Sequence, residues 1–297
     1  MNRELTYNLN DEENKTIIAF LKEKGYSIPI LQNLKSNPTD VLLDGEPGFL
    51  NRIIKNRINL TVMIRETQKS DYISSNIPLD ILYEDDDLII INKAADMPIH
   101  PSINHQEGTL ANALTYYYRN ESSPFIYRCL NRLDKNTTGI TVVAKNPLSS
   151  AILSQQMKND NIHRTYYAVV SGIIDSPGVI NAPIARASNS IITREVNFKE
   201  GQEAITEYEP LKVSDNNTLI KCTLKTGRTH QIRVHMSYIG HPLVGDFLYG
   251  NTDKTSVSGR QLLHAGEIAF THPITGDKML ITAPLPEDFG ELRILLP

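Results

Sequence analysis

The chain has 297 residues, of which 40% are apolar and 22% are charged, so it can form a large and a small domain with packed cores and is not disordered. A net charge of −4 and a pI near 6.1 argue against a generic nucleic-acid binder, which is normally basic. Two cysteines, Cys129 and Cys222, exclude a disulfide framework and a cysteine zinc site, which fits a reducing compartment.

Residues 1–72 are neutral, with ten basic and ten acidic side chains. The pattern predicts helices over 16–24 and 29–36 and strands over 41–45 and 59–65. This outline resembles the small S4-type RNA-binding module, although its basic helix face is reduced here to three lysines, Lys22, Lys24 and Lys35. RNA binding and a merely packed accessory role are therefore both open. The polar residues 66–77 are expected to form a linker.

The remaining residues, 73–297, are predicted to be mainly strands with intervening helices. Asn146 and Pro147 open a helix to about residue 160, followed by a strand over 165–171. Strands over 206–213 and 218–224 are joined by a polar turn, which is typical of an antiparallel hairpin. These elements predict an α+β fold on a bent, mainly antiparallel sheet. We expect no membrane-spanning segment and no signal peptide, hence a cytoplasmic protein.

A polar loop, residues 131–140, joins two apolar runs and places Asp134 at its tip. A turn of Asn, Thr and Gly follows, and Arg132 lies two residues before the carboxylate. A carboxylate held this way is aimed and accessible, as a nucleophile requires. Taken alone, the same pattern also describes an ordinary turn.

Residues 216–245 contain no acidic side chain, while they carry Lys221, Lys225, Arg228, Arg233 and three histidines. Such a stripe predicts a basic groove in an otherwise acidic protein. His230 and His235 are five residues apart and would face different ways on a helix, so we expect no metal site.

The loop 131–140 resembles the catalytic loop of RluA-type pseudouridine synthases, which usually begins His-Arg-Leu-Asp and ends Thr-Ser-Gly. The resemblance continues in order through the segments 81–93, 97–101, 109–114, 164–168, 226–235, 240–246, 263–265 and 282–286. It implies the pseudouridine synthase fold, with an S4-like domain over 1–72 and a catalytic domain over 73–297.

The implied activity isomerises uridines in structured RNA without a cofactor or metal. The bond between ribose C1′ and uracil N1 breaks, and the base is rejoined through C5. Asp134 is the implied nucleophile, and attack on uracil C6 or on ribose C1′ are both open. Ribosomal RNA, 23S above all, is favoured over transfer RNA, and a monomer is expected. The target uridine would be selected by variable loops such as 187–201.

The resemblance also assigns roles to other residues. Arg233 matches the arginine that pairs with the catalytic carboxylate; we expect it on a helix that Thr229 caps and that runs to Ile239. Tyr166 matches the tyrosine that stacks on the base, while Tyr167 would point to the other side of its strand. For base flipping and RNA binding we expect Arg132, Arg228 and His230.

Two departures from the family pattern are Asn131 in place of histidine and Thr138 in place of serine. A catalytically silent RNA-binding or ribosome-assembly factor is an alternative, but it would need no nucleophile with a partner cation. A carboxylate-based glycoside hydrolase would need a second acid at the site, and the sequence offers only one.

Overall fold

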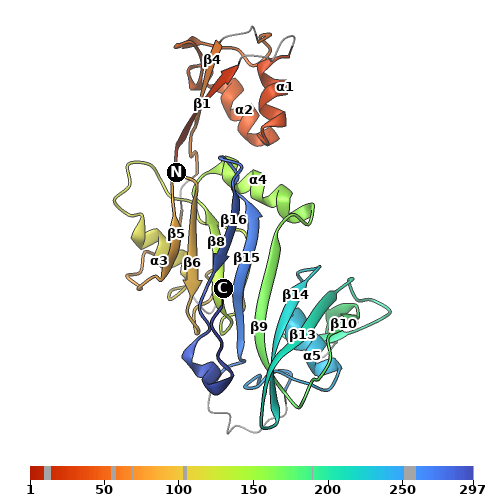
Figure 1. Cartoon of the computed structure of the whole chain (residues 1–297). Helices are drawn as coiled ribbons and strands as arrows, with labels where there is room; N and C mark the ends of the chain where they lie inside the picture. The colour runs from red at the N-terminus through yellow and green to blue at the C-terminus, as the bar shows by residue number, and fades with distance from the viewer. Residues whose placement is uncertain are drawn as a thin grey trace.

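The computed structural model describes residues 1–9, 15–54, 58–68, 70–102, 106–188, 190–250 and 259–296. A small N-terminal unit lies at one end of a large mixed sheet with helices beside it (Figure 1). This arrangement confirms the predicted α+β class with a small domain before the main one, and the sheet of that small domain is antiparallel. No helix in these ranges is both long and apolar enough to cross a membrane.

The N-terminal unit is a four-stranded sheet in the order β1-β4-β2-β3, packed against two helices. Its elements are β1 (Arg3–Leu9), α1 (Ile17–Glu23), α2 (Ile28–Ser36), the 3-10 turn η1 (Pro38–Asp40), β2 (Val41–Leu43), β3 (Glu46–Pro47) and β4 (Ile58–Ile64). Both predicted helices and both predicted strands are present. Strand β1 was not predicted, although Leu5, Tyr7 and Leu9 alternate with polar residues as a half-buried strand requires.

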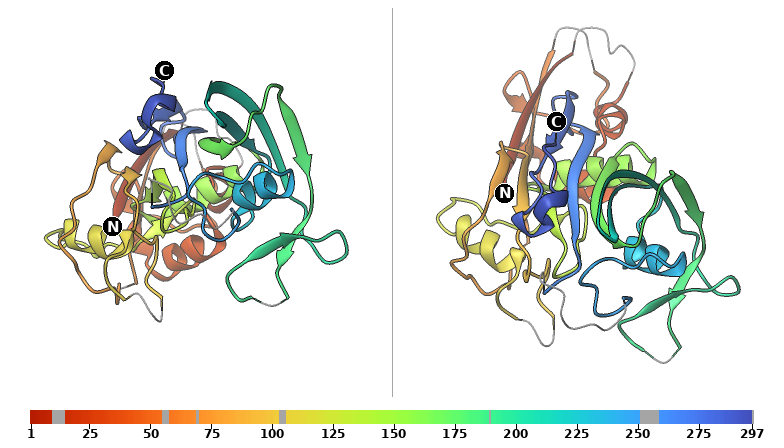
Figure 2. Two further views of the ribbon diagram at one scale, coloured as in Figure 1. Left: turned by 90° about the horizontal axis from the view of Figure 1, so that it is seen from below. Right: turned by 60° about the horizontal axis from the view of Figure 1, so that its bottom comes forward.

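The large sheet has the order β10-β13-β14-β9-β15-β8-β6-β5, with β16 on β15 and β7 on β8. Figure 2 shows that it bends, so that β13 and β14 curve beside α5. Its elements are β5 (Ile81–Glu84), β6 (Leu88–Lys93), α3 (Leu110–Tyr117), β7 (Arg128–Cys129), β8 (Thr138–Ala144), α4 (Pro147–Lys158), β9 (His163–Ser171), β10 (Gly178–Asn181), β11 (Ile184–Arg186), β12 (Arg194–Val196), β13 (Ile205–Ser214), β14 (Asn217–Leu224), α5 (Gln231–Tyr238), β15 (Leu263–Thr271), β16 (Lys278–Thr282) and η2 (Glu287–Leu292).

Local chemistry explains the elements that the sequence predicted best. The side chain of Asn146 accepts a hydrogen bond from the Ser149 N–H, and Pro147 occupies the first turn of α4. Strands β13 and β14 pair antiparallel up to Ser214 and Asn217, where Asp215 takes a positive φ of 48°. The predicted helix and hairpin are both confirmed.

Strand β15 lies between β8 and β9, and it runs parallel to β8 at Thr138 and Gly139. Gly139 has a φ of 107°, and a Cβ there would lie 2.2 Å from the carbonyl oxygen of Ala265. Any side chain would push the two strands apart, so this position requires glycine. The turn that ends the Asp134 loop is thereby fixed to the centre of the sheet.

The N-terminal unit shares its core with α4, because Leu148 is part of its hydrophobic cluster and Ile152 packs against that cluster. Arg3 also donates two hydrogen bonds of 3.0 Å to the buried Asp87, next to β6. These contacts tie the unit to the main domain.

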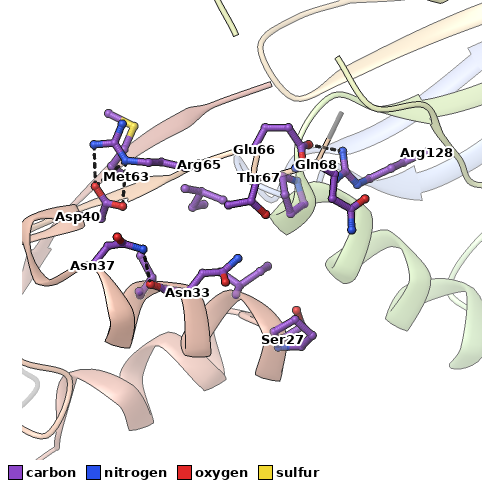
Figure 3. Close-up of a pocket in the computed structure, with 15 residues that line it drawn as sticks. Ser27, Asn33, Asn37, Asp40, Met63, Arg65, Glu66, Thr67, Gln68 and Arg128 are labelled. Carbon is purple, nitrogen blue, oxygen red and sulfur yellow. Dashed lines mark hydrogen bonds and ion pairs between the residues drawn. The ribbon is translucent and has the colours of Figure 1, made fainter. Parts of the chain in front are cut away.

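A cavity of about 250 Å³ lies at this junction, lined by both parts of the chain. Figure 3 shows that Arg65 is paired with Asp40 inside the N-terminal unit, and that Arg128 of the main domain is paired with Glu66 at 2.7 Å. Its charged side chains are thus neutralised in ion pairs.

Candidate active site

A side chain of the loop itself, that of Asn131, anchors the loop that carries Asp134. The amide of Asn131 donates to the carbonyl of Ile140 at 2.8 Å and accepts from the N–H of Val142 at 2.9 Å. Asn131 is buried, so both bonds are sheltered from water. The asparagine that replaces the family histidine therefore anchors the loop to β8, and the Asp134 side chain remains 25% exposed.

A buried lysine braces the other side of the loop. The Lys93 ammonium, at the end of β6, donates to the carbonyl oxygens of Ala94, Met97 and Lys135 at 2.7, 2.9 and 3.0 Å. Three acceptors match the three donors of a charged lysine. Burial lowers the pKa of Lys93 to about 7, and the nearby charge of Asp134 opposes that shift. Sequence reasoning missed this residue, although a lysine ending an apolar strand was a signal.

Arg233 joins two carboxylates. Its guanidinium donates one hydrogen bond of 2.7 Å to Asp134 and two, of 2.7 and 2.8 Å, to Asp246. Only 5% of Arg233 is exposed. Burial opposes its charge, but the hydrogen bonds and charge of Asp246, together with Asp134, raise the pKa of Arg233 above its ordinary value. Asp246 was given no role from the sequence; it is the acid that ends the acid-free stripe.

The start of α5 differs from the prediction. Thr229 is not the cap: His230 takes a left-handed conformation, with φ at 59°, in the N-cap position and makes no side-chain cap bond. The side-chain oxygen of Gln231 turns back instead and accepts from the Arg228 N–H and the Thr226 hydroxyl. The helix ends at Tyr238, one residue before the predicted Ile239.

His230 faces Asp134 through a defined nitrogen. The hydroxyl of Tyr249 accepts from the backbone N–H of Arg194 at 2.9 Å, so its own hydrogen is free to donate to Nδ1 of His230 at 2.7 Å. Nε2 then carries the ring proton, 3.6 Å from an Asp134 oxygen. Burial lowers the pKa of His230, which keeps the ring neutral. Tyr249 was not found from the sequence, because no motif marks it.

Tyr166 and Tyr167 point to opposite sides of β9, as the alternation of a strand predicts. Tyr166 packs in the same hydrophobic cluster as Leu133 of the loop, whereas Tyr167 lies in another cluster and its hydroxyl donates to Glu267. Burial raises the pKa of Tyr166, so its hydroxyl keeps the proton at neutral pH.

An open hollow of about 60 Å³ lies where these elements meet. Its lining includes all six residues that were predicted to be catalytic or to bind and flip the RNA base: Arg132, Asp134, Tyr166, Arg228, His230 and Arg233. The loop before β8, strand β9 and the start of α5 thus bring a carboxylate, an aromatic ring and several cations together. Arg132 and Arg228 are exposed at its edge.

The predicted basic groove is largely neutralised. Lys221 pairs with Glu209 at 3.1 Å and Lys225 with Glu207 at 3.6 Å, because β13 sets carboxylates beside β14. Arg233 is buried against Asp134 and Asp246. Among the four cations of the stripe, Arg228 alone has no carboxylate partner within the described ranges.

The histidines do not form a metal site together. His235 is buried, and its ring contacts the Thr206 hydroxyl and the Ala182 carbonyl, away from His230. In the described part of the chain, one group, Asp85, Asp87 and His272, brings metal-type ligand atoms close together. Asp87 there already binds Arg3, Asn146 and Ser149, so its oxygens serve the junction with the N-terminal unit.

Comparison with known proteins gives this site a class. The model of the RNA pseudouridylate synthase family matches residues 87–238. A Bacillus subtilis protein named as an uncharacterized RNA pseudouridine synthase, YjbO, is 39% identical over 93% of this chain and 98% of its own length. Ribosomal large subunit pseudouridine synthase D of Haemophilus influenzae is 39% identical over 80% of this chain and 76% of its own. The solved human RNA pseudouridylate synthase domain containing 1 has 26% identity and a TM-score of 0.60, covering 75% of this chain and 92% of that one.

The family model and the relatives identify the class of protein, an isomerase that rearranges uridine within RNA. The chain belongs to the RNA pseudouridylate synthase family, in its RluA-type branch, and is a pseudouridine synthase. The S4-like character of the N-terminal unit and the boundary at residue 72 remain predictions.

Proposed function

We propose that the protein converts specific uridines of large-subunit ribosomal RNA to pseudouridine, with Asp134 as the nucleophile. The observation that carries the proposal is the 2.7 Å bond between Arg233 and Asp134 at an open hollow. A guanidinium this close fixes the direction of the carboxylate through a charge-assisted hydrogen bond.

In the proposed reaction Asp134 adds to ribose C1′ or to uracil C6, and the bond between C1′ and N1 breaks. The freed uracil turns in place until C5 faces C1′. A bond between C5 and C1′ then forms as the carboxylate departs, C5 loses its proton and N1 gains one. The product has the atoms of the substrate, so the reaction needs no redox partner and no energy source.

The other residues of the hollow have proposed roles that follow from their positions. Tyr166 offers the detached base an aromatic face, and stacking of this kind is worth about 1–3 kcal/mol per base. Arg132, exposed beside Asp134, would fill the gap that the flipped nucleotide leaves. Arg228 and His230 would bind the target nucleotide from the other side.

The relatives favour ribosomal RNA over transfer RNA as the substrate. Several that are 39–41% identical to this chain are named ribosomal large subunit pseudouridine synthase D. Such a substrate would place the protein in the cytoplasm. A silent RNA-binding factor on the same fold is disfavoured, because the Asp134–Arg233 pair is of no use to a pure binder.

The test is to map pseudouridine across total RNA from cells with and without the gene, and to restore it with variants. The wild-type gene and an Asp71→Asn control, which removes an exposed charge far from the loop in sequence, should restore the same sites. Asp134→Asn should restore none while binding RNA normally. Modification by the Asp134→Asn protein would refute the proposed nucleophile, and sites confined to transfer RNA would refute the proposed substrate.

A further inference from the structure

A second hollow, of about 500 Å³, adjoins the site on the side of the arm formed by β11 and β12. Three of its lining residues are arginines, namely Arg186, Arg194 and Arg228. Arg228 lines the catalytic hollow as well, so the two hollows share a wall. Figure 2 shows the arm projecting from the body of the protein beside α5.

Two of these arginines stand in an unfavourable arrangement. Arg186 and Arg194 are directly opposite each other in the antiparallel pair of β11 and β12, so their side chains leave the same face a short distance apart. Like charges in this position repel. Neither forms an ion pair within the part of the chain that the structure describes. Glu200 is the one carboxylate in the lining, set against three cations.

The arm is also tied to the catalytic carboxylate. Its backbone at Arg194 donates to the Tyr249 hydroxyl, which donates to His230, whose Nε2 lies 3.6 Å from Asp134. Ile184 and Val196 at its base pack against Val234 of α5. An anion held between the two arginines would therefore sit at a fixed position relative to Asp134.

We propose that Arg186 and Arg194, with Arg228, bind a backbone phosphodiester of the RNA close to the uridine being isomerised. Guanidinium groups suit this ligand, because their planar forks match two phosphate oxygens at once. A bound phosphate would also remove the repulsion between the paired arginines. The lysines of the acid-free stripe are engaged with β13, so this hollow adds to the positive charge that Arg132 supplies beside the site. The proposal rests on the proposed function.

The first test measures RNA affinity against salt concentration. The probe is an unmodified transcript of a large-subunit rRNA segment that contains a mapped target uridine. For Arg186→Gln with Arg194→Gln, the arm variant, we expect Kd to rise about tenfold. The slope of log Kd against log salt should fall by about 0.7 for each phosphate that the variant no longer neutralises. Arg119→Gln with Arg293→Gln is the matched control, because it also removes two guanidiniums, both of them exposed and outside this hollow.

The second test locates the phosphate. Methylphosphonate linkages, which carry no charge, are placed one at a time on either side of the target uridine in a short RNA. One position should weaken binding of the wild type and leave the arm variant unaffected. Arg186→Lys with Arg194→Lys, which keeps the charge, should recover part of the affinity and confirm that the arm is folded.

Two results would overturn the proposal. One is an arm variant with the affinity and salt slope of the Arg119→Gln, Arg293→Gln control. The other is a neutral linkage that affects the wild type and the arm variant equally at every position. Binding is also measured in the Asp134→Asn background. If the proposed chemistry is wrong, the wild-type protein will make no pseudouridine in this RNA. The affinities of the wild type and the arm variant can still be compared in that case, so the two proposals fail separately.

Discussion

Asp246 accepts two hydrogen bonds from Arg233, at 2.7 and 2.8 Å, through the Nε and Nη2 atoms that do not face Asp134. Asp246 is 3% exposed, so this pair of hydrogen bonds fixes the plane of the guanidinium within the protein. The remaining nitrogen, Nη1, then points at the carboxylate of the loop. In the proposed mechanism Asp246 would therefore be a positioning residue that acts through Arg233.

Asp246→Asn should lower the rate of pseudouridine formation about tenfold to a hundredfold, because an amide cannot accept both bonds and Arg233 is free to turn. RNA affinity should hardly change. Single-turnover rates and Kd are measured side by side, with Asp288→Asn, which weakens the comparable Arg260–Asp288 pair, as the control. Equal losses in both variants would show a general effect on stability.

Asn131→Asp should loosen the loop while leaving Asp134 in the chain. A carboxylate still accepts from the Val142 N–H, but it presents a second oxygen to the Ile140 carbonyl in place of a donor. Losing one such buried bond costs about 1–3 kcal/mol. Denaturant unfolding should show this loss, and turnover should fall with it. Unchanged stability would mean that the asparagine does not anchor the loop.

Arg132→Ala should reduce turnover on folded RNA more than on a short flexible strand. The exposed guanidinium is expected to replace a flipped nucleotide, and a flexible strand has no stack to repair. Rates are compared on a structured transcript and on an oligonucleotide with the same target uridine. Equal losses on the two RNAs would argue against a role in flipping.

Acid should destabilise the protein partly through His264. Burial lowers the pKa of His264 to about 4, and its ring accepts from the Thr138 hydroxyl while donating to the Ala283 carbonyl. The unfolded chain binds its proton near pH 6.5, so this stability is complete above pH 6.5 and is lost as the pH falls toward 4. The contribution is on the order of 3 kcal/mol.

Denaturant unfolding at several pH values measures this effect. His264→Gln should flatten the curve between pH 6.5 and 4, while the exposed His163→Gln should leave it unchanged. If the free energy of unfolding of His264→Gln falls with pH as steeply as that of the wild type, the acid sensitivity arises from other groups.

Point variants can test whether the N-terminal unit binds RNA. Removing residues 1–72 would expose the apolar side chains of Leu148 and Ile152 on α4 and so destabilise the main domain. A loss of RNA affinity in such a deletion would therefore not show whether the unit itself binds RNA. Lys22 and Lys35 instead flank an exposed groove of about 650 Å³ that includes Phe49. If the unit binds RNA, Lys22→Gln with Lys35→Gln should raise Kd with Tm unchanged. An unchanged Kd would indicate that the unit only packs against the main domain.

The sequence was informative where a local pattern controls the structure. The Asn146 cap, the β13–β14 hairpin and the opposite faces of Tyr166 and Tyr167 depend on neighbours in the chain, and each was predicted correctly. Asp246, Tyr249 and Lys93 act through partners distant in sequence, which periodicity cannot reveal. The prediction that Thr229 caps the helix was wrong, because His230 adopts a left-handed backbone conformation and the side chain of Gln231 accepts the hydrogen bonds before the helix.

The position of β15 has a consequence for how the enzyme is made. Its pairing partners β8 and β9 carry the segments that present Asp134 and Tyr166, yet β15 is synthesised more than ninety residues after the second of them. Until Leu263–Thr271 has left the ribosome, the two halves of the sheet have no strand to join them. A nascent or shortened chain that lacks β15 should therefore be inactive toward any RNA near it, and catalysis should begin only after this strand has emerged.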